Sequence, residues 1–110
     1  MAVKLGLAPE KVAQVVTTGT GRSFAADFFI PLTLENRFDE GYPVKSAYKD
    51  LISAAEISAH KGIPLPVVNA TAVTFQMAIA EGFGDLSKGG LIRLFEKMLK
   101  TEFRKKGDAK

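Results

Sequence analysis

The sequence of 110 residues predicts an all-α fold, a single domain of four to five helices. Apolar residues recur at intervals of three and four along most of the chain, which is the spacing of one helix face. We find no stretch with the alternation of apolar and polar residues, bounded by turn residues, that is typical of a half-buried strand. Apolar residues make up 46% and charged residues 25% of the chain, so it is expected to form one core.

The N-terminal segment is expected to contain the end of one helix and the whole of the next. Ala2–Leu5 is interpreted as a helix end that Gly6 closes. Pro9 suits the first position of the following helix, because its missing N–H leaves no intrahelical bond unmade there. That helix is expected to run to about Thr18.

The segment TGTGRS, Thr18–Ser23, combines glycines, an arginine and a helix start, as a phosphate-binding loop does. No strand precedes it, and neither the Walker spacing nor the dinucleotide fingerprint is met. We therefore interpret it as a turn between helices, with Ser23 as the N-cap of a helix over Phe24–Leu34. Pro31 lies inside this helix and is predicted to kink it or to end it near Ile30.

The strongest helix prediction covers Val44 to Lys61. Its apolar residues follow the i, i+3, i+4, i+7 spacing of an amphipathic helix. Lys61 suits the negative end of the helix dipole, and Gly62 is a common residue just after a helix. Pro64 and Pro66 prevent the helix from continuing. The apolar face consists of Val44, Ala47, Tyr48, Leu51, Ile52 and Ala55.

Two more helices complete the prediction. The segment Val67–Ala80 is apolar almost all round, which is typical of a central and deeply buried helix. Asp85 or Ser87 is predicted to cap the last helix through its side-chain oxygen. The apolar face of that last helix consists of Leu91, Leu94, Phe95, Met98 and Leu99.

Composition limits the classes of function. The chain has no cysteine, which excludes thiolate metal sites and is compatible with a reducing cytoplasm. The one histidine, His60, is expected at the surface near a helix end, and no metal site is predicted. The first residues lack the apolar segment of a signal peptide, and no apolar run approaches the ~20 residues of a membrane span. A cytoplasmic location is therefore expected.

The net charge of +3 comes partly from the C-terminal end of the chain. Residues 104–110 are expected to be a disordered basic tail that follows a helical domain of residues 1–103. A basic nucleic-acid-binding protein is one alternative, in which binding would depend steeply on salt and would need this tail. No basic patch interleaved with aromatic residues accompanies it, so this alternative ranks last.

Lys49 and Asp50 stand side by side near the start of the helix over residues 44–61. Adjacent helical side chains point about 100° apart, so the two are not expected to pair with each other. The helix dipole favours Asp50 in the early turns and disfavours Lys49 there. Such a lysine indicates an anionic partner, or simply a long side chain that reaches water.

Four motifs occur in order along the chain, namely G-x-G-R-S, YPVKSAYKDL, GIPLP and GFGDLS. This order resembles the C-terminal helical domain of the β-hydroxyacid dehydrogenase family, which includes 3-hydroxyisobutyrate dehydrogenase. The resemblance extends from about Ala2 to Leu99. It implies a fold like the C-terminal domain of 6-phosphogluconate dehydrogenase, and hydride transfer between NAD or NADP and a small β-hydroxyacid or semialdehyde.

The same resemblance implies three site residues. Lys49 corresponds to the lysine that reaches the cofactor near its nicotinamide end, and Asp50 to the aspartate that holds the polar network of the site. Tyr42 stands where relatives often place a phenylalanine against the substrate. The family's catalytic lysine, in a G-x-x-G-x-G-x-x-x-K-x-x-x-N pattern, and its Rossmann loop have no counterpart in this sequence. No catalytic residue is therefore assigned, and this chain is expected to be inactive without a Rossmann-type partner domain.

Two interpretations remain open at this stage. The chain is part of such a dehydrogenase (a fragment, a truncated gene product or a separately encoded half), or it is a non-catalytic helical interaction module. Both predict exposed apolar surface where another domain would pack, and such surface favours self-association. A homo-oligomer is therefore expected, while the substrate and the choice between NAD and NADP stay open.

Overall fold

In the computed structural model, which describes residues 1–106, the chain forms five α-helices and two short 3₁₀ helices. Strand-like pairing in this part of the chain is limited to an isolated β-bridge between Pro43 and Ser87. The predicted all-α fold is confirmed. None of these helices combines the length and the apolar character needed to cross a membrane. The elements are η1 (Ala2–Leu5), α1 (Pro9–Thr18), α2 (Phe24–Leu34), α3 (Val44–Lys61), α4 (Pro66–Ala80), η2 (Lys88–Leu91) and α5 (Ile92–Leu99).

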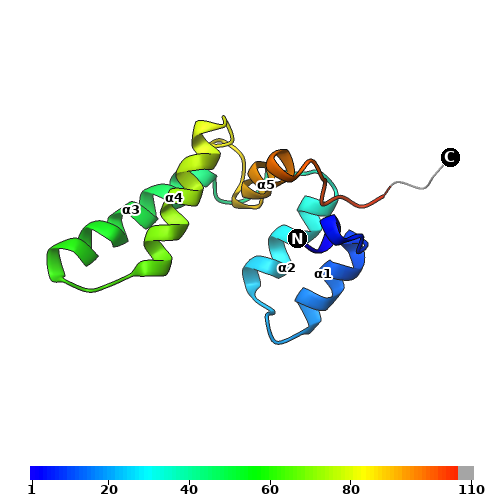
Figure 1. The fold of residues 1–110 in the computed structure, drawn as a ribbon, viewed down its shortest axis with the longest axis horizontal. Helices are drawn as coiled ribbons and strands as arrows, with labels where there is room; N and C mark the ends of the chain where they lie inside the picture. Colours follow the sequence, from blue (N-terminus) through cyan, green and yellow to red (C-terminus); the bar gives the residue numbers. More distant parts are fainter. Residues whose placement is uncertain (107–110) are drawn as a thin grey trace.

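The helices form two hairpins that are joined through α5 and η2 (Figure 1). Helices α1 and α2 pack on each other in one lobe, and α3 packs along α4 in a second lobe that projects away from the first. The molecule is accordingly elongated, with extents of 57 × 32 × 25 Å. A pair of helices buries only the faces that meet, so each lobe leaves an outer face uncovered.

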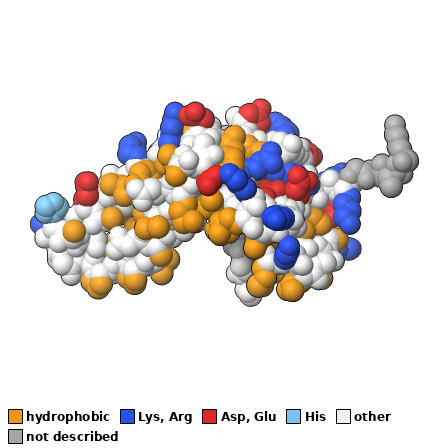
Figure 2. Space-filling view, turned by 45° about the horizontal axis from the view of Figure 1, so that its top comes forward, with side chains coloured by type: hydrophobic (Ala, Val, Ile, Leu, Met, Phe, Trp, Pro, Cys, Tyr) orange, Lys and Arg blue, Asp and Glu red, His pale blue; other side chains and the backbone are white. Residues whose placement is uncertain are grey.

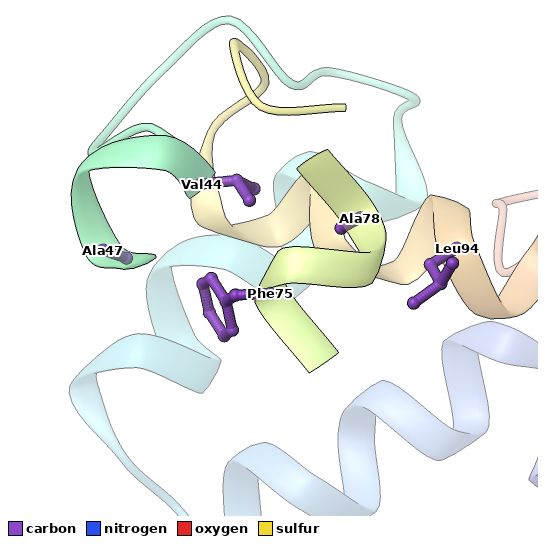
Figure 3. Packing of buried hydrophobic residues seen from close by; sticks show 5 residues of the cluster. All are labelled: Val44, Ala47, Phe75, Ala78 and Leu94. Carbon is purple, nitrogen blue, oxygen red and sulfur yellow. The ribbon is translucent and has the colours of Figure 1, made fainter. Parts of the chain in front are cut away.

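The hydrophobic core lies where α3, α4 and α5 meet (Figure 3). Val44 and Ala47 of α3 face Phe75 and Ala78 of α4, and Leu94 of α5 closes the cluster. Val44 and Ala78 are completely buried. The apolar face predicted for the helix over residues 44–61 is therefore the face that α3 turns to the core.

The first turn of α3 is capped by backbone carbonyl groups of a distant loop. Pro43 occupies the N-cap position, and no side chain caps the helix there. Instead, the Val44 N–H donates to the Leu86 carbonyl at 2.8 Å, and the Lys45 N–H donates to the Gly84 carbonyl at 2.9 Å. These bonds satisfy two of the N–H groups that a helix start leaves without an intrahelical partner. The GFGDLS motif therefore holds α3 in place.

The same loop is held from the other side by two reciprocal bonds. The Ser87 N–H donates to the Phe38 carbonyl at 2.9 Å, and the Lys88 N–H donates to the Tyr42 carbonyl at 2.8 Å. The segment before α3 and the loop after α4 are thus bonded to each other on both sides of Pro43. This pairing closes the hairpin of α3 and α4 at the end where the chain enters and leaves it.

Several helix ends follow the local signals in the sequence. Pro9 is the first residue of α1, and Ser23 caps α2 by accepting a hydrogen bond of 3.0 Å from the Ala26 N–H. Gly62 ends α3 with a φ of 65°, a left-handed conformation that glycine adopts without steric cost. These predictions are confirmed.

Helix α2 does not end near Ile30, because it continues through Pro31 to Leu34. Beyond the proline, Thr33 is only 5% exposed, and its hydroxyl donates to the Phe29 carbonyl at 2.8 Å. Burial of this last turn outweighs the loss of one backbone bond at the proline.

The predicted cap of the last helix is also wrong. Asp85 makes an ion pair of 2.5 Å with Lys45 on α3, and the hydrogen bond from this lysine lowers the pKa of the Asp85 carboxyl. Ser87 stands at the N-cap position of η2, but its side chain makes no capping bond. The first N–H group of η2, that of Lys88, donates instead to the Tyr42 carbonyl at 2.8 Å.

Helix α4 contains more buried residues than any other helix of residues 1–106, but it is buried on one face and not all round. Ala72, Phe75 and Ala78 are buried, but Val73 and Met77 are 55% and 44% exposed. An apolar helix is buried all round only if other elements surround it, and α4 packs mainly on α3. On α5, similarly, Leu94 is buried while Phe95, Met98 and Leu99 of the predicted face are exposed.

The first residues of the predicted basic tail pack against the folded chain. Arg104 is only 12% exposed, and its guanidinium Nη2 lies 2.9 Å from Oε1 of Glu96, whose side chain is 8% exposed. The guanidinium also covers the Phe38 ring and donates to Asn36 Oδ1 at 3.0 Å. The Lys106 N–H likewise donates to Glu10 Oε1 at 3.0 Å, and the domain boundary after residue 103 stays a prediction. Residues 107–110 lie outside the described part.

Replacing Arg104 by methionine should lower the free energy of unfolding by about 3 kcal/mol, because it leaves the buried Glu96 carboxylate without its cation. Urea denaturation followed by circular dichroism measures this. Lys105→Met is the matched control, because Lys105 is exposed and its hydrogen bond to the Leu34 carbonyl comes from its backbone N–H. It should change the free energy of unfolding by less than about 0.5 kcal/mol. Equal stability of the two variants would contradict the buried ion pair.

Candidate functional site

Two of the three residues predicted for the site, Tyr42 and Asp50, lie along one side of α3. Tyr42 precedes the helix, and Asp50 stands eight residues later, with Ser46 midway between them. Residues four apart lie one above the other on a helix, so this spacing lines up all three. The eight-residue spacing of Tyr42 and Asp50 is therefore a signal in the sequence that favours contact between them.

A hydrogen bond joins Tyr42 to Asp50. The Tyr42 hydroxyl donates to Asp50 Oδ2 at 2.8 Å and lies 3.4 Å from the Ser46 carbonyl. The hydrogen bond to Asp50 raises the pKa of Tyr42 above its ordinary value, and partial desolvation and the charge of the carboxylate act in the same direction. Tyr42 is 41% exposed, so this pair is accessible from solvent.

Lys49 lies beside this pair. Its ammonium is 3.8 Å from Asp50 Oδ1, so the expectation that the two neighbours do not pair is wrong. The long lysine side chain spans the angle between adjacent helical positions, which short side chains cannot do. The contact is longer than a direct hydrogen bond, and the Lys49 and Asp50 side chains are 73% and 60% exposed. Lys49 therefore presents its charge to solvent next to the Tyr42–Asp50 pair.

A second cation, Lys88, borders the site and was not predicted. Its ammonium lies 5.8 Å from the centre of the Tyr42 ring and 5.3 Å from that of Phe29, within the range of cation–π attraction. Lys88 is the first residue of η2, 39 positions after Lys49 in the sequence. No local pattern links the two lysines, and only the folded chain brings them to one site.

The turn before Tyr42 requires a glycine. Gly41 has a φ of 98°, and a side chain there would come within 3.0 Å of the Phe29 ring. The chain then enters α3 through Pro43, whose fixed φ limits the conformations available to Tyr42. Together with the bond between Lys88 N–H and the Tyr42 carbonyl, this turn fixes the tyrosine next to α3.

The other candidates lie apart from these residues. Thr18–Ser23 forms the turn between α1 and α2, as expected, and Arg22 pairs with Asp27 at 3.0 Å. His60 is exposed in the last turn of α3, at the far end of the helix from Tyr42. Within residues 1–106, no three histidine, aspartate or glutamate side chains gather in a way that could hold a metal ion.

The fold and this lysine–aspartate–tyrosine cluster define an all-α domain with a polar, exposed site at the start of its longest helix. Residues 1–95 match the family described as NAD-binding of NADP-dependent 3-hydroxyisobutyrate dehydrogenase. The chain therefore belongs to this family of NAD-binding domains, and the resemblance drawn from its four motifs is confirmed.

Two curated relatives are similar to the chain along most of its length. It is 27% identical over 99 residues to 2-(hydroxymethyl)glutarate dehydrogenase of Eubacterium barkeri, a match that covers 89% of this chain. It is 28% identical over 96 residues to the uncharacterized oxidoreductase YkwC of Bacillus subtilis (strain 168), a match that covers 87% of this chain. The matches span 33% of each relative, so the chain corresponds to about a third of these proteins.

Replacing Asp50 by asparagine should lower the pKa of Tyr42 toward the ordinary value of a tyrosine, because the neutral amide no longer opposes formation of a phenolate. Ultraviolet absorption during an alkaline titration measures this pKa. A Tyr48→Phe background leaves Tyr42 as the only tyrosine. An unchanged Tyr42 titration would show that the hydrogen bond between residues 42 and 50 is not formed in solution.

Proposed function

We propose that this chain supplies one wall of the cofactor and substrate cleft of an NAD(P)-dependent dehydrogenase that acts on a small β-hydroxyacid or semialdehyde. The observation that carries the proposal is the cluster of Tyr42, Lys49 and Asp50, joined by a hydrogen bond of 2.8 Å and a contact of 3.8 Å. Family membership and the similarity to a hydroxyacid dehydrogenase support it.

The residues of the cluster fit an anionic dinucleotide. Lys49 is 73% exposed and makes only a long contact with its neighbour, so its ammonium is accessible to a negatively charged group. Lys88 adds a second positive charge beside the Tyr42 ring. Cations beside a cleft also raise the local concentration of anions such as a nucleotide or a hydroxyacid. When bound, NAD(P) supplies the centre that accepts or donates hydride.

Each residue then has a distinct role in the proposal. Lys49 neutralises negative charge on the cofactor, and Asp50 orients both its neighbours by accepting from Tyr42 and attracting Lys49. Tyr42 presents its ring edge toward the substrate, with its hydroxyl already engaged by Asp50. A tyrosine in place of the family's usual phenylalanine therefore adds a hydrogen bond that restrains the ring, and its hydroxyl group is not left unpaired.

The proposal includes the partners that complete the enzyme. A Rossmann-type domain provides most of the dinucleotide contacts and the catalytic lysine, and the helical domain also contributes to a homo-oligomer. The exposed apolar side chains of α1, α2, α4 and α5 support such contacts, because surface of this kind is stabilised when another chain or domain covers it. A chain without cysteine is compatible with a reducing compartment, and we propose the cytoplasm as the location of the assembly.

Lys49→Ala should weaken NADH binding about tenfold in a complex of this chain with a Rossmann-type domain supplied in trans, because a charge-assisted contact is worth at least about 1.4 kcal/mol. The fluorescence of NADH titrated with the complex measures the dissociation constant. Lys61→Ala is the matched control, since Lys61 is an exposed lysine at the opposite end of the same helix, and it should leave the constant unchanged.

Equal NADH affinity of these two variants would contradict the assignment of Lys49. It would favour the other interpretation, a helical interaction module that has no direct contact with the cofactor.

A further inference from the structure

Lys88 differs from every other lysine of residues 1–106. It is half-buried, whereas the other nine are exposed. Elsewhere basic side chains lie among acidic ones, as the face in Figure 2 shows, and several form ion pairs, such as that of Lys45 with Asp85. The ion pairs within residues 1–106 do not include Lys88. Because partial burial of a charge costs free energy unless an opposite charge meets it, this lysine is suited to bind an anion.

The surroundings of Lys88 hold its ammonium in a defined place. The ammonium lies 5.3 Å from the centre of the Phe29 ring and 5.8 Å from that of Tyr42. The Phe29 ring is closely packed, since a β-carbon at Gly41 would lie 3.0 Å from one of its atoms and a β-carbon at Gly89 3.3 Å from another. The two rings attract the cation, but they carry no net charge and do not neutralise it.

The two lysines of the site meet different parts of Tyr42. Lys49 lies next to Asp50, the carboxylate that accepts from the tyrosine hydroxyl at 2.8 Å. Lys88 lies over the ring itself, on the side where Phe29 of α2 also contacts the ammonium. A molecule that lies along the Tyr42 ring therefore meets positive charge in two separate places.

We propose that Lys88 binds a second carboxylate of the substrate, which is then a dicarboxylic β-hydroxyacid or the corresponding semialdehyde. This inference rests on the proposed function and names its substrate class. In a β-hydroxyacid, one carbon atom separates the first carboxylate from the carbon that carries the hydroxyl group, so the first carboxylate stays beside the hydride-transfer centre. An anionic group that reaches Lys88 therefore belongs to the other end of the substrate.

The chemistry around Lys88 fits a carboxylate in particular. One ammonium balances the single negative charge of one carboxylate and donates charge-assisted hydrogen bonds to its oxygens. The neighbouring rings of Phe29 and Tyr42 exclude water from one side of the ammonium, which strengthens an ion pair there. The carbon atoms between the two carboxylates would pack on the Tyr42 ring. In the proposed function this ring faces the substrate, whereas Lys49 faces the cofactor.

The kinetics of the complex of this chain with a Rossmann-type domain supplied in trans test the substrate class. β-Hydroxyacids are compared in pairs, in which a side chain of one or two methylene groups on the α-carbon ends in a carboxylate or in a methyl group. For at least one pair, the unmodified complex should prefer the diacid at least about tenfold in kcat/KM. Lys88→Met keeps an apolar stem against both rings and should remove this preference, mainly by raising KM for the diacid.

Two further variants separate charge from packing. Lys88→Arg keeps the charge and should retain most of the preference. Lys61→Met is the matched control, since Lys61 is an exposed lysine at the far end of α3, and it should leave the preference unchanged. A preference that survives Lys88→Met, or a loss of NADH affinity in this variant with the preference intact, would overturn the role of Lys88.

The same complex distinguishes failure of this inference from failure of the proposed function. An unmodified complex that binds NADH but prefers none of the diacids would overturn the substrate class and leave the cofactor wall intact. An unmodified complex that does not bind NADH would overturn the proposed function and this inference with it.

Discussion

The rest of the structure depends on the backbone pairing between the start of α3 and the loop that follows α4. Val44 and Lys45 donate to the carbonyls of Leu86 and Gly84, and their chain neighbours return bonds in the opposite direction. Pro43 offers no side-chain cap, so without these carbonyls the first turn of the longest helix would have unsatisfied N–H groups. The pairing also aligns α3 against α4, where the completely buried Val44 anchors the core.

The candidate site is a consequence of the same pairing. Tyr42 and Lys88 are bonded through their backbones, so the tyrosine ring and the second cation come together at the start of α3. Asp50 then meets the tyrosine from the same helix face, and Lys49 lies next to it. Backbone hydrogen bonds hold the residue that carries the tyrosine ring, and the side chains of Lys49 and Asp50 are exposed to solvent. This is what one wall of a cleft requires when another domain provides the opposite wall.

Local signals in the sequence predicted the fold well. The proline at the start of α1, Ser23 at the start of α2 and Gly62 at the end of α3 each act through a few neighbouring residues, which the sequence shows directly. The continuation of α2 through Pro31 depends on burial of its last turn, and the position of Arg104 depends on Glu96 and Phe38. Contacts between residues so far apart leave no local pattern.

Burial was predicted less well than helicity, for a physical reason. The hydrophobicity of α4 is a property of its residues, whereas its exposure depends on how many neighbours it has. In the site, similarly, Tyr42, Lys49 and Asp50 were found from a motif on one stretch of chain, but Lys88 comes from a separate segment. Val73 and Met77 are exposed because α3 covers only the side of α4 that carries Phe75 and Ala78.

The exchange rates of the Val44 and Lys45 amide protons test the central pairing most directly. Hydrogen exchange followed by nuclear magnetic resonance reports the free energy needed to open each bond. If the loop carbonyls cap α3, both amides should exchange as slowly as those in the middle of the helix. Exchange as fast as that of Val67 and Val68, in the first turn of α4 where no side chain caps the helix, would contradict the account.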